Sequence, residues 1–172
     1  MIFTKLIGTQ EINETDVKMN YRQAVRAVII HNKKILLIHS NQGDYKLPGG
    51  GVEMNENHPE ALLREVAEET GYINCVMKDK IGVVIERHID EYDDHAYFQM
   101  TSHYYLCELT DGEKVAQKLD HYESEQEFTP EWLTLDDAIS QNQKVMKQFQ
   151  QNRWIIRENF VLNELKNLHE AE

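Results

Sequence analysis

The order of apolar and polar residues predicts strands in the first third of the chain. Residues 24–30 and 34–39 consist largely of Ala, Val, Ile and Leu, and the polar residues between them suit a hairpin turn. Residues 47–51 contain Pro48 followed by three glycines. This composition favours an irregular loop, because proline lacks a backbone donor and glycine permits dihedral angles closed to other residues. We therefore expect two strands that lead into a glycine-rich loop.

A helix is predicted over residues 59–70, directly after this loop. Pro59 suits the first turn of a helix, and Gly71 suits its C-terminal end. Further strands are predicted at residues 80–87, 96–109 and 131–135. From about residue 136 to its end the chain shows a helical pattern.

This order of elements indicates the α+β class. Strands on both sides of a central helix, followed by helical sequence, suggest a mixed sheet covered by helices on its faces, with a C-terminal helical segment. The chain is about one domain long, and we expect residues 1–172 to form a single domain.

Acidic residues outnumber basic ones, which narrows the range of partners. The 172 residues include 30 Asp and Glu against 18 Lys and Arg, so the formal net charge is −12. A phosphate backbone attracts clustered basic side chains, and we therefore expect no nucleic-acid polymer as a partner. A small phosphate-containing ligand stays compatible with this charge, because one bound divalent cation reverses the local sign.

Cysteine usage and hydropathy lead us to expect a cytoplasmic protein. Cys75 and Cys107 lie far apart and outside any metal-ligand spacing, which favours two buried, reduced thiols over a disulfide. The N-terminal residues lack the apolar run of a secretion signal, and no stretch approaches the ~20 apolar residues of a membrane span. We expect no association with a membrane.

Three glutamates of the expected helix carry the candidate chemistry. With ~100° between successive residues, Glu65, Glu68 and Glu69 share one stripe, and Arg64 borders it. Carboxylates at this spacing repel one another, and a hard divalent cation removes the repulsion by using their oxygens as ligands. Acidic stripes are also common on solvated helix surfaces, so the stripe alone leaves a metal site and a surface as alternatives.

The residues around the stripe make a longer pattern. Gly50, five residues, Glu56, seven residues and the run 64–71 (Arg-Glu-Val-Ala-Glu-Glu-Thr-Gly) resemble the Nudix box of the Nudix hydrolases. The last position departs from the family pattern, because Tyr72 stands where an aliphatic residue is usual. That position serves packing, so the departure bears on the core rather than on the chemistry.

The resemblance implies a fold, a reaction and a cofactor. The implied fold is the family's alpha/beta/alpha sandwich, with the box forming a loop-helix-loop over the sheet. The implied reaction is hydrolysis of a nucleoside diphosphate linked to another moiety, with Mg²⁺ or Mn²⁺ as the cofactor. Divalent ions suit this reaction, because they polarise phosphoryl oxygens and lower the pKa of a bound water.

The resemblance also implies roles for individual residues. Glu65, Glu68 and Glu69 match the metal-binding and catalytic carboxylates of the family, with Glu65 or another nearby acid as the base. Glu56 matches a residue that binds metal or supports the site, and Arg64 matches the arginine that fixes the glutamates. The glycine turn adds a candidate ligand, the backbone carbonyl of Gly49 or Gly50.

Members of the family often take one more acidic ligand from a loop shortly before the last strand. Residues 121–128 occupy this place, just before Trp132, and contain three glutamates. We expect Glu127, and after it Glu125, to supply the ligand, because Glu127 lies closer to Trp132 in the sequence. Solvated acids of an acidic protein are the alternative reading.

Other catalytic classes lack their motifs in this sequence. Ser102 and Ser124 stand in no nucleophile elbow, and Gly49–Gly51 is not followed by the Gly-Lys-Ser/Thr of a phosphate-binding loop. Four tyrosines offer rings for stacking on a nucleobase, although aromatics at alternating strand positions mostly serve packing. They are Tyr45, Tyr92, Tyr97 and Tyr104.

The resulting hypothesis is a divalent-metal-dependent pyrophosphohydrolase acting on a small nucleotide. The substrate candidates are ADP-ribose and related nucleotide sugars, dinucleoside polyphosphates, and ordinary or oxidised nucleoside triphosphates. A non-hydrolytic nucleotide-binding or regulatory module is the main alternative. An isoprenoid diphosphate isomerase ranks lower, because it would need a reactive cysteine in the site. The residues before Tyr21 and after Asn152 are available for a homodimer interface or for capping the core.

Overall fold

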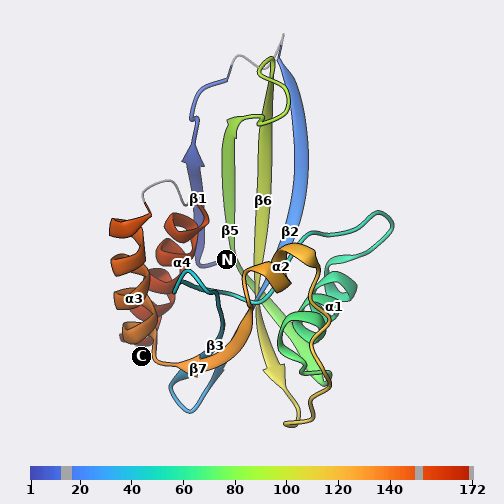
Figure 1. Cartoon of the computed structure of the whole chain (residues 1–172), viewed down its shortest axis with the longest axis vertical. Helices are drawn as coiled ribbons and strands as arrows, with labels where there is room; N and C mark the ends of the chain where they lie inside the picture. The colour runs from blue at the N-terminus through green and yellow to red at the C-terminus, as the bar shows by residue number, and fades with distance from the viewer. Residues whose placement is uncertain (13–16, 150–152, 171–172) are drawn as a thin grey trace.

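The sheet lies at the centre of the molecule and has helices on both of its sides (Figure 1). A computed structural model describes residues 1–12, 17–149 and 153–170. The strands of this part of the chain are β1 (Phe3–Gly8), β2 (Lys18–His31), β3 (Lys34–His39), β4 (Tyr45–Lys46), β5 (Cys75–Ile89), β6 (Ala96–Leu109) and β7 (Thr129–Leu133). The helices are α1 (His58–Thr70), α2 (His121–Glu125), α3 (Leu135–Gln148) and α4 (Arg153–Glu170).

The sheet is mixed, as the sequence predicted. Its strand order is β1-β5-β6-β2-β3-β4, and β7 pairs with the other edge of β3. The β1–β5 and β2–β6 pairs are parallel, while the remaining pairs are antiparallel. Three long strands, β2, β5 and β6, run side by side and extend beyond the helices (Figure 1).

Alternate residues of β2 face the two helical layers. Val25, Ala27 and Ile29 belong to a buried cluster that contains Leu62 and other residues of α1. Val28 belongs to a second cluster, which includes buried residues of α3 and α4. Because side chains of a strand alternate between its faces, one strand supports both layers. The expected alpha/beta/alpha sandwich of the α+β class is therefore confirmed.

The helix over residues 59–70 is confirmed and begins one residue earlier. Asn57 caps the helix, because its side chain accepts a hydrogen bond from the backbone N–H of Glu60. In turn, the Glu60 carboxylate accepts one from the Asn57 backbone N–H at 2.9 Å. This reciprocal pair satisfies two donors of the first turn. Gly71 ends the helix in the left-handed region, with φ at 82°, which glycine adopts without strain.

The ends of the chain differ most from the sequence-based expectation. Strand β1 was not predicted, yet it pairs with β5 and buries Phe3 in the core. The C-terminal helical pattern forms two helices, α3 and α4, and α4 buries Leu162 and Leu165. Both terminal elements thus cap the core, which was one of the two alternatives for them.

The strand expected at residues 131–135 begins and ends two residues earlier, as β7. Thr134 marks the difference, because its side chain caps α3 by accepting from the Asp137 N–H at 3.2 Å. Residues 134–135 therefore belong to the start of a helix rather than to the strand. Cys75 and Cys107 are free and buried, as expected.

Gly82 permits the docking of β1. A Cβ atom at this position would collide with the ring of Phe3, which packs directly on the glycine. We expect Gly82→Ala to lower the free energy of unfolding by about 1–3 kcal/mol, because overpacking forces the ring aside. Chemical denaturation measures this change. Gly112→Ala is the matched control, because a Cβ there meets no atom of the described residues within 4 Å. Equal stability of the two variants would contradict this packing.

A histidine pair makes stability dependent on pH. The rings of His58 and His103 lie 4.5 Å apart, and burial lowers the pKa of His103 to about 4, with Lys80 and His58 adding to the effect. The unfolded chain, whose histidines titrate near 6.5, binds more protons between these values, so stability falls as pH drops from 6.5 toward 4. We expect His103→Gln to reduce this slope in denaturation curves. An unchanged slope in His103→Gln would contradict this role of His103. His95→Gln is the control, because His95 is exposed and its replacement should leave the slope unchanged.

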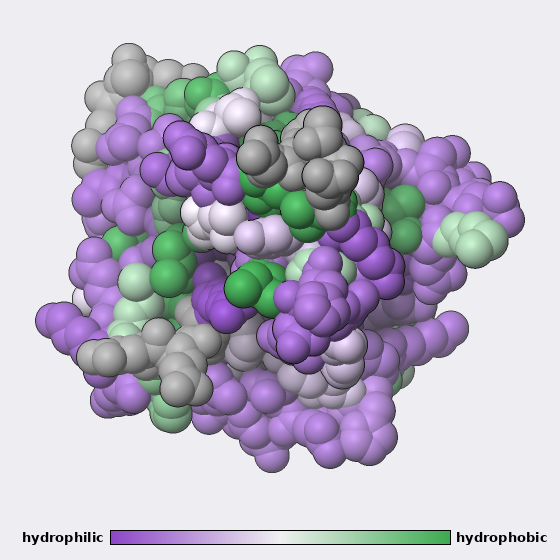
Figure 2. All heavy atoms as spheres, turned by 90° about the horizontal axis from the view of Figure 1, so that it is seen from above, coloured by the Kyte–Doolittle hydropathy of each residue, from purple (hydrophilic) through white to green (hydrophobic). Residues whose placement is uncertain are grey.

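The described helices include none that is both long and apolar enough to span a membrane. Seen from above, the surface is mainly hydrophilic, and its hydrophobic residues form small separate patches (Figure 2). The view agrees with the high proportion of charged residues in the sequence.

Candidate metal and catalytic site

Three carboxylates from two helices converge beside the glycine-rich loop. Glu65 and Glu69 come from α1 and Glu123 comes from α2, and one oxygen of each lies within 4.8 Å of the others. No other group of three acids, histidines or cysteines among the described residues meets this spacing. A set of carboxylate oxygens without nitrogen or sulfur fits a hard cation such as Mg²⁺ or Mn²⁺. We call these residues the carboxylate trio.

Glu69 is the most deeply buried member of the trio. Its side chain is fully buried, and one oxygen accepts from the Gly49 backbone N–H at 2.9 Å. The other oxygen lies 3.1 Å from the Lys46 ammonium, whose nitrogen also lies 3.9 Å from the centre of the Phe128 ring. The loop and strand β4 therefore fix this carboxylate in one orientation.

Glu65 lies against the glycine loop. A Cβ atom on Gly50 would sit 2.5 Å from the Glu65 carboxylate, so only glycine permits this approach. Burial raises the pKa of Glu65 to about 7. The hydrogen bond from Arg64 lowers this pKa, while the negative charge of Glu69 raises it further. Burial also raises the pKa of Glu123, again with a contribution from Glu69. A bound cation would relieve this shared cost of close negative charge.

Arg64 ties the helix to the loop. Its guanidinium binds both oxygens of Glu56, at 2.7 and 2.9 Å, and also contacts Glu65 at 2.8 Å, Glu68 at 3.3 Å and the Gly51 carbonyl at 3.1 Å. Such a planar fork orients several carboxylates at once, which lysine does not reproduce. The Arg64 hydrogen bond holds the pKa of Glu56 at about 2, so Glu56 carries a stable negative charge.

The other box residues lie around the trio. Glu56 has both oxygens engaged by Arg64 and stands outside the trio, which suits the supporting role rather than the ligand role. Glu68 is about a third exposed and lies outside the trio as well. The Gly50 carbonyl accepts from the Val25 N–H at 3.0 Å and keeps a second lone pair.

The member of the trio from outside the box is Glu123, where the sequence had favoured Glu127 and Glu125. Glu127 is exposed and follows α2 in a left-handed turn, with φ at 53°, and Glu125 is exposed beside His121. Nearness to Trp132 in the sequence was therefore a poor guide to nearness in space. Asp120 and Glu123 form a capping box at the start of α2, and this spacing is the signal that could have located the helix.

The comparison with known families agrees with this geometry. The chain matches the NUDIX domain over residues 20–155, which include every residue of the site described above. The chain belongs to the Nudix family. The resemblance found in the box is confirmed, and the box helix α1 lies over the sheet as the family pattern implies.

Curated relatives match about half of the chain. An ADP-ribose pyrophosphatase of Methanocaldococcus jannaschii is 37% identical over 83 residues, which cover 46% of this chain and 48% of the relative. A putative 8-oxo-dGTP diphosphatase of Bacillus subtilis is 32% identical over 98 residues, covering 56% and 59%. The Nudix chain thus spans about half to three fifths of the length of these relatives.

Solved structures support the same fold. A Nudix hydrolase from Nitrosomonas europaea matches with a TM-score of 0.55 and 19% identity, over 87% of this chain and 89% of the other. A UDP-X diphosphatase matches with a TM-score of 0.50 and 23% identity, over 72% of this chain and 56% of the other. At these identities the likeness concerns the fold alone.

Three cavities of the Nudix chain adjoin one another through shared lining residues, and residues of the trio line two of them. The outer cavity, of about 370 Å³, is lined by Arg22, Glu65, Lys118 and Glu123 among others. The central cavity, of about 380 Å³, shares Arg22, Glu65 and Glu123 with it and adds Arg26 and Glu69. The inner cavity, of about 240 Å³, shares Arg26, Lys46, Met100 and Tyr122 with the central one and adds two aromatic residues, Phe128 and Trp154.

The tyrosines proposed for base stacking do not line these cavities. Tyr104 is fully buried, Tyr92 is almost fully exposed, and Tyr45 donates its hydroxyl to Glu131 at 2.7 Å. The aromatic residues Tyr122 and Trp154 line the inner cavity instead. Cys75 and Cys107 belong to the core cluster on the α1 side and line none of the three cavities, so the isomerase alternative gains no support.

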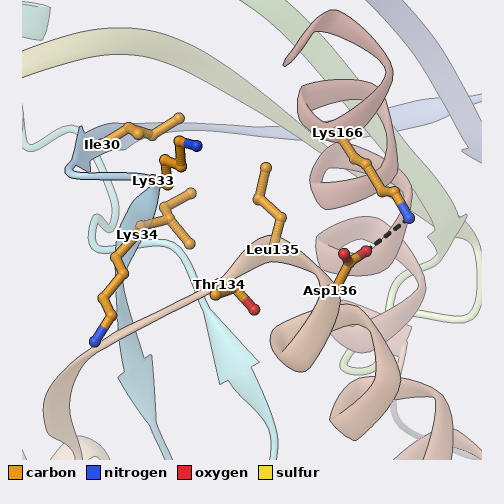
Figure 3. A pocket seen from close by; sticks show the side chains of 8 residues that line it. Ile30, Lys33, Lys34, Thr134, Leu135, Asp136 and Lys166 are labelled. Carbon is orange, nitrogen blue, oxygen red and sulfur yellow. Dashed lines mark ion pairs between the residues drawn. The ribbon is translucent and has the colours of Figure 1, made fainter. Parts of the chain in front are cut away.

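Another pocket, of about 470 Å³, lies between the β2–β3 turn and the start of α3 (Figure 3). Its charged residues include Asp136 and Lys166, which form an ion pair at 2.6 Å, and Lys33 and Lys34. In Figure 3 Lys34 extends away from Leu135. This pocket contains none of the trio residues, so the carboxylates identify the adjoining cavities as the site.

Proposed function

We propose that the chain hydrolyses the diphosphate linkage of a small nucleoside diphosphate derivative, using a divalent cation held by the carboxylate trio. The observation that carries the proposal is the convergence of Glu65, Glu69 and Glu123 beside three connected cavities. The relatives named for ADP-ribose and 8-oxo-dGTP support this reaction class. Proposed substrates are a nucleotide sugar such as ADP-ribose, a dinucleoside polyphosphate, or an ordinary or oxidised nucleoside triphosphate.

The residues of the chain divide the work of the reaction. When bound, a divalent cation would neutralise the charge of the diphosphate and lower the pKa of a water molecule. Glu65 can accept the proton of the attacking water, because its carboxylate lines the outer and central cavities beside the other two acids of the trio. The water oxygen bonds to one phosphorus, the bridging P–O bond breaks, and the bridging oxygen leaves with the other phosphoryl group.

Arg64 and Glu56 position the base without taking part in bond making. Arg64 donates to Glu65 at 2.8 Å, and Glu56 keeps the guanidinium in place through two bonds. Glu69 is held by Gly49 and Lys46, so two members of the trio have fixed orientations before substrate binds. Preorganisation of this kind removes a cost that would otherwise fall on the reaction.

A panel of nucleotides tests the proposal. We expect a nucleoside monophosphate and a second phosphorylated product, separated by chromatography, with Mg²⁺ or Mn²⁺ and none with excess chelator. Turnover that persists in chelator would contradict the metal-dependent reaction. Nucleotide binding by calorimetry without any product under either metal would support a non-hydrolytic module instead.

A further inference from the structure

Two arginines of β2 face the site without an ion pair to a carboxylate of the described residues. Arg22 and Arg26 are four residues apart, so their side chains share one face of the strand, with Ala24 between them. Neither lies within 4.0 Å of a carboxylate oxygen of any described residue. This is unusual in a chain with a net charge of −12. Both guanidinium groups line the central cavity.

Arg26 is buried with unused hydrogen-bonding capacity. Only 7% of the residue is exposed, and its guanidinium donates to the Gly49 carbonyl at 2.5 Å. Its Nε–H is buried and has no hydrogen-bond partner among the described residues. A buried cation without a charged partner is costly, and an anion in the central cavity, which Arg26 lines, would offset its charge.

Arg22 occupies the opposite end of the same face. Its Nη2 lies beside Gly51, where a Cβ atom would be only 2.7 Å away, and the residue lines both the outer and the central cavity. Lys118 lines the outer cavity as well and forms no ion pair with the described residues. The outer end of the site therefore carries two cations that form no ion pair with the described residues, although Glu53, Glu68 and Asp120 line the same cavity.

The glycine loop sets the order of these groups. Gly51 lies beside Arg22, Gly50 beside the Glu65 carboxylate, and Gly49 accepts from Arg26. The loop runs antiparallel to β2, with the Val25 N–H donating to the Gly50 carbonyl. At ~3.3 Å per residue the two arginine Cα atoms are about 13 Å apart. The trio therefore has one arginine on each side of it.

We propose that these two arginines bind the two phosphoryl groups of the substrate, with Arg26 on the nucleoside-bearing one and Arg22 on the outer one. The inference rests on the proposed diphosphate hydrolysis and adds an orientation to it. The inner cavity beyond Arg26 is lined by the rings of Tyr122 and Trp154, and flat aromatic rings are suited to a nucleobase. Guanidinium groups bind phosphate oxygens through paired hydrogen bonds.

Calorimetric titration with two kinds of probe distinguishes the roles of the two arginines. The probes are nucleoside monophosphates, AMP and GMP, and their α,β-methylene diphosphate counterparts, which cannot be cleaved at that bridge. We expect Arg26→Gln to weaken both kinds of probe by about 10-fold, because a charge-assisted bond is lost from the shared phosphoryl group. Arg22→Gln should weaken only the diphosphate probes, by about 10-fold, and leave the monophosphates unchanged.

The controls address folding and charge. Arg87→Gln removes a guanidinium that is bonded to Gln99 outside the three cavities, and it should bind all probes like the wild type. Because Arg26 is buried, Arg26→Lys keeps the charge at this position, and its thermal melting is compared with that of Arg26→Gln. If Arg26→Gln fails to fold, a folded Arg26→Lys with wild-type affinity for the monophosphates overturns the assignment.

Binding does not require turnover, so this inference and the proposed hydrolysis fail separately. A chain that hydrolyses the panel normally while both arginine variants bind every probe like the wild type would refute the arginine roles alone. If Arg22→Gln weakened monophosphate binding while Arg26→Gln bound monophosphates like the wild type, the orientation would be reversed and the assignment overturned. Wild-type protein that binds no monophosphate probe would overturn it as well.

Discussion

Glu65→Gln is expected to lower kcat by about 10²–10⁴-fold, the range found when a general base is lost. The amide has nearly the same shape, so the helix and its cap stay intact while the proton acceptor and a negative ligand oxygen disappear. Glu123→Gln should also lower turnover, because its oxygen lies within 4.8 Å of those of Glu65 and Glu69. Steady-state kinetics at saturating Mn²⁺ measures both variants.

The matched control for this prediction is Glu127→Gln. It makes the same chemical change four residues after Glu123, at an exposed side chain outside the trio, and should leave kcat and KM unchanged. Loss of activity in Glu127→Gln with full activity in Glu123→Gln would restore the expectation drawn from the sequence. It would also show that α2 is placed differently in the working protein.

The box and its helix were predictable because local rules determine them. A capping residue, an early proline, a terminal glycine and a fixed glutamate spacing all lie within residues 50–72, so position on the helix follows directly from the sequence. The apolar run of residues 24–30 similarly indicated a strand, and the structure adds that Val25 and Val28 pack on its opposite faces. Tyr72 fills its packing position, since its hydroxyl accepts from the Trp132 indole at 3.1 Å.

Residues brought together by the tertiary fold were not predictable in the same way. Glu123 reaches the trio through a short helix whose placement depends on contacts distant in sequence, such as the Lys118 N–H bonding to the Glu68 carbonyl. Arg22 and Arg26 read as ordinary polar positions of a strand until the glycine loop is seen beside them. Strand β1 depends on Gly82, a single small residue far along the chain.

Arg64→Lys is expected to reduce turnover by about 10–100-fold, the usual cost of losing a residue that orients metal ligands. Lysine keeps the positive charge but has no planar fork, so it cannot bind both oxygens of Glu56 while also holding Glu65. The Glu65 carboxylate would then be less well oriented toward the other two members of the trio.

This loss should appear in the metal dependence of the reaction. The Mn²⁺ concentration for half-maximal activity should rise in Arg64→Lys, and excess Mn²⁺ should restore part of the activity, because metal binding can recover the lost orientation at the expense of affinity. Lys78→Gln serves as the control, since that side chain forms an exposed ion pair with Glu108 on the sheet. An unchanged Mn²⁺ dependence in Arg64→Lys, with kcat still reduced, would mean that Arg64 acts on the substrate and does not position the ligands.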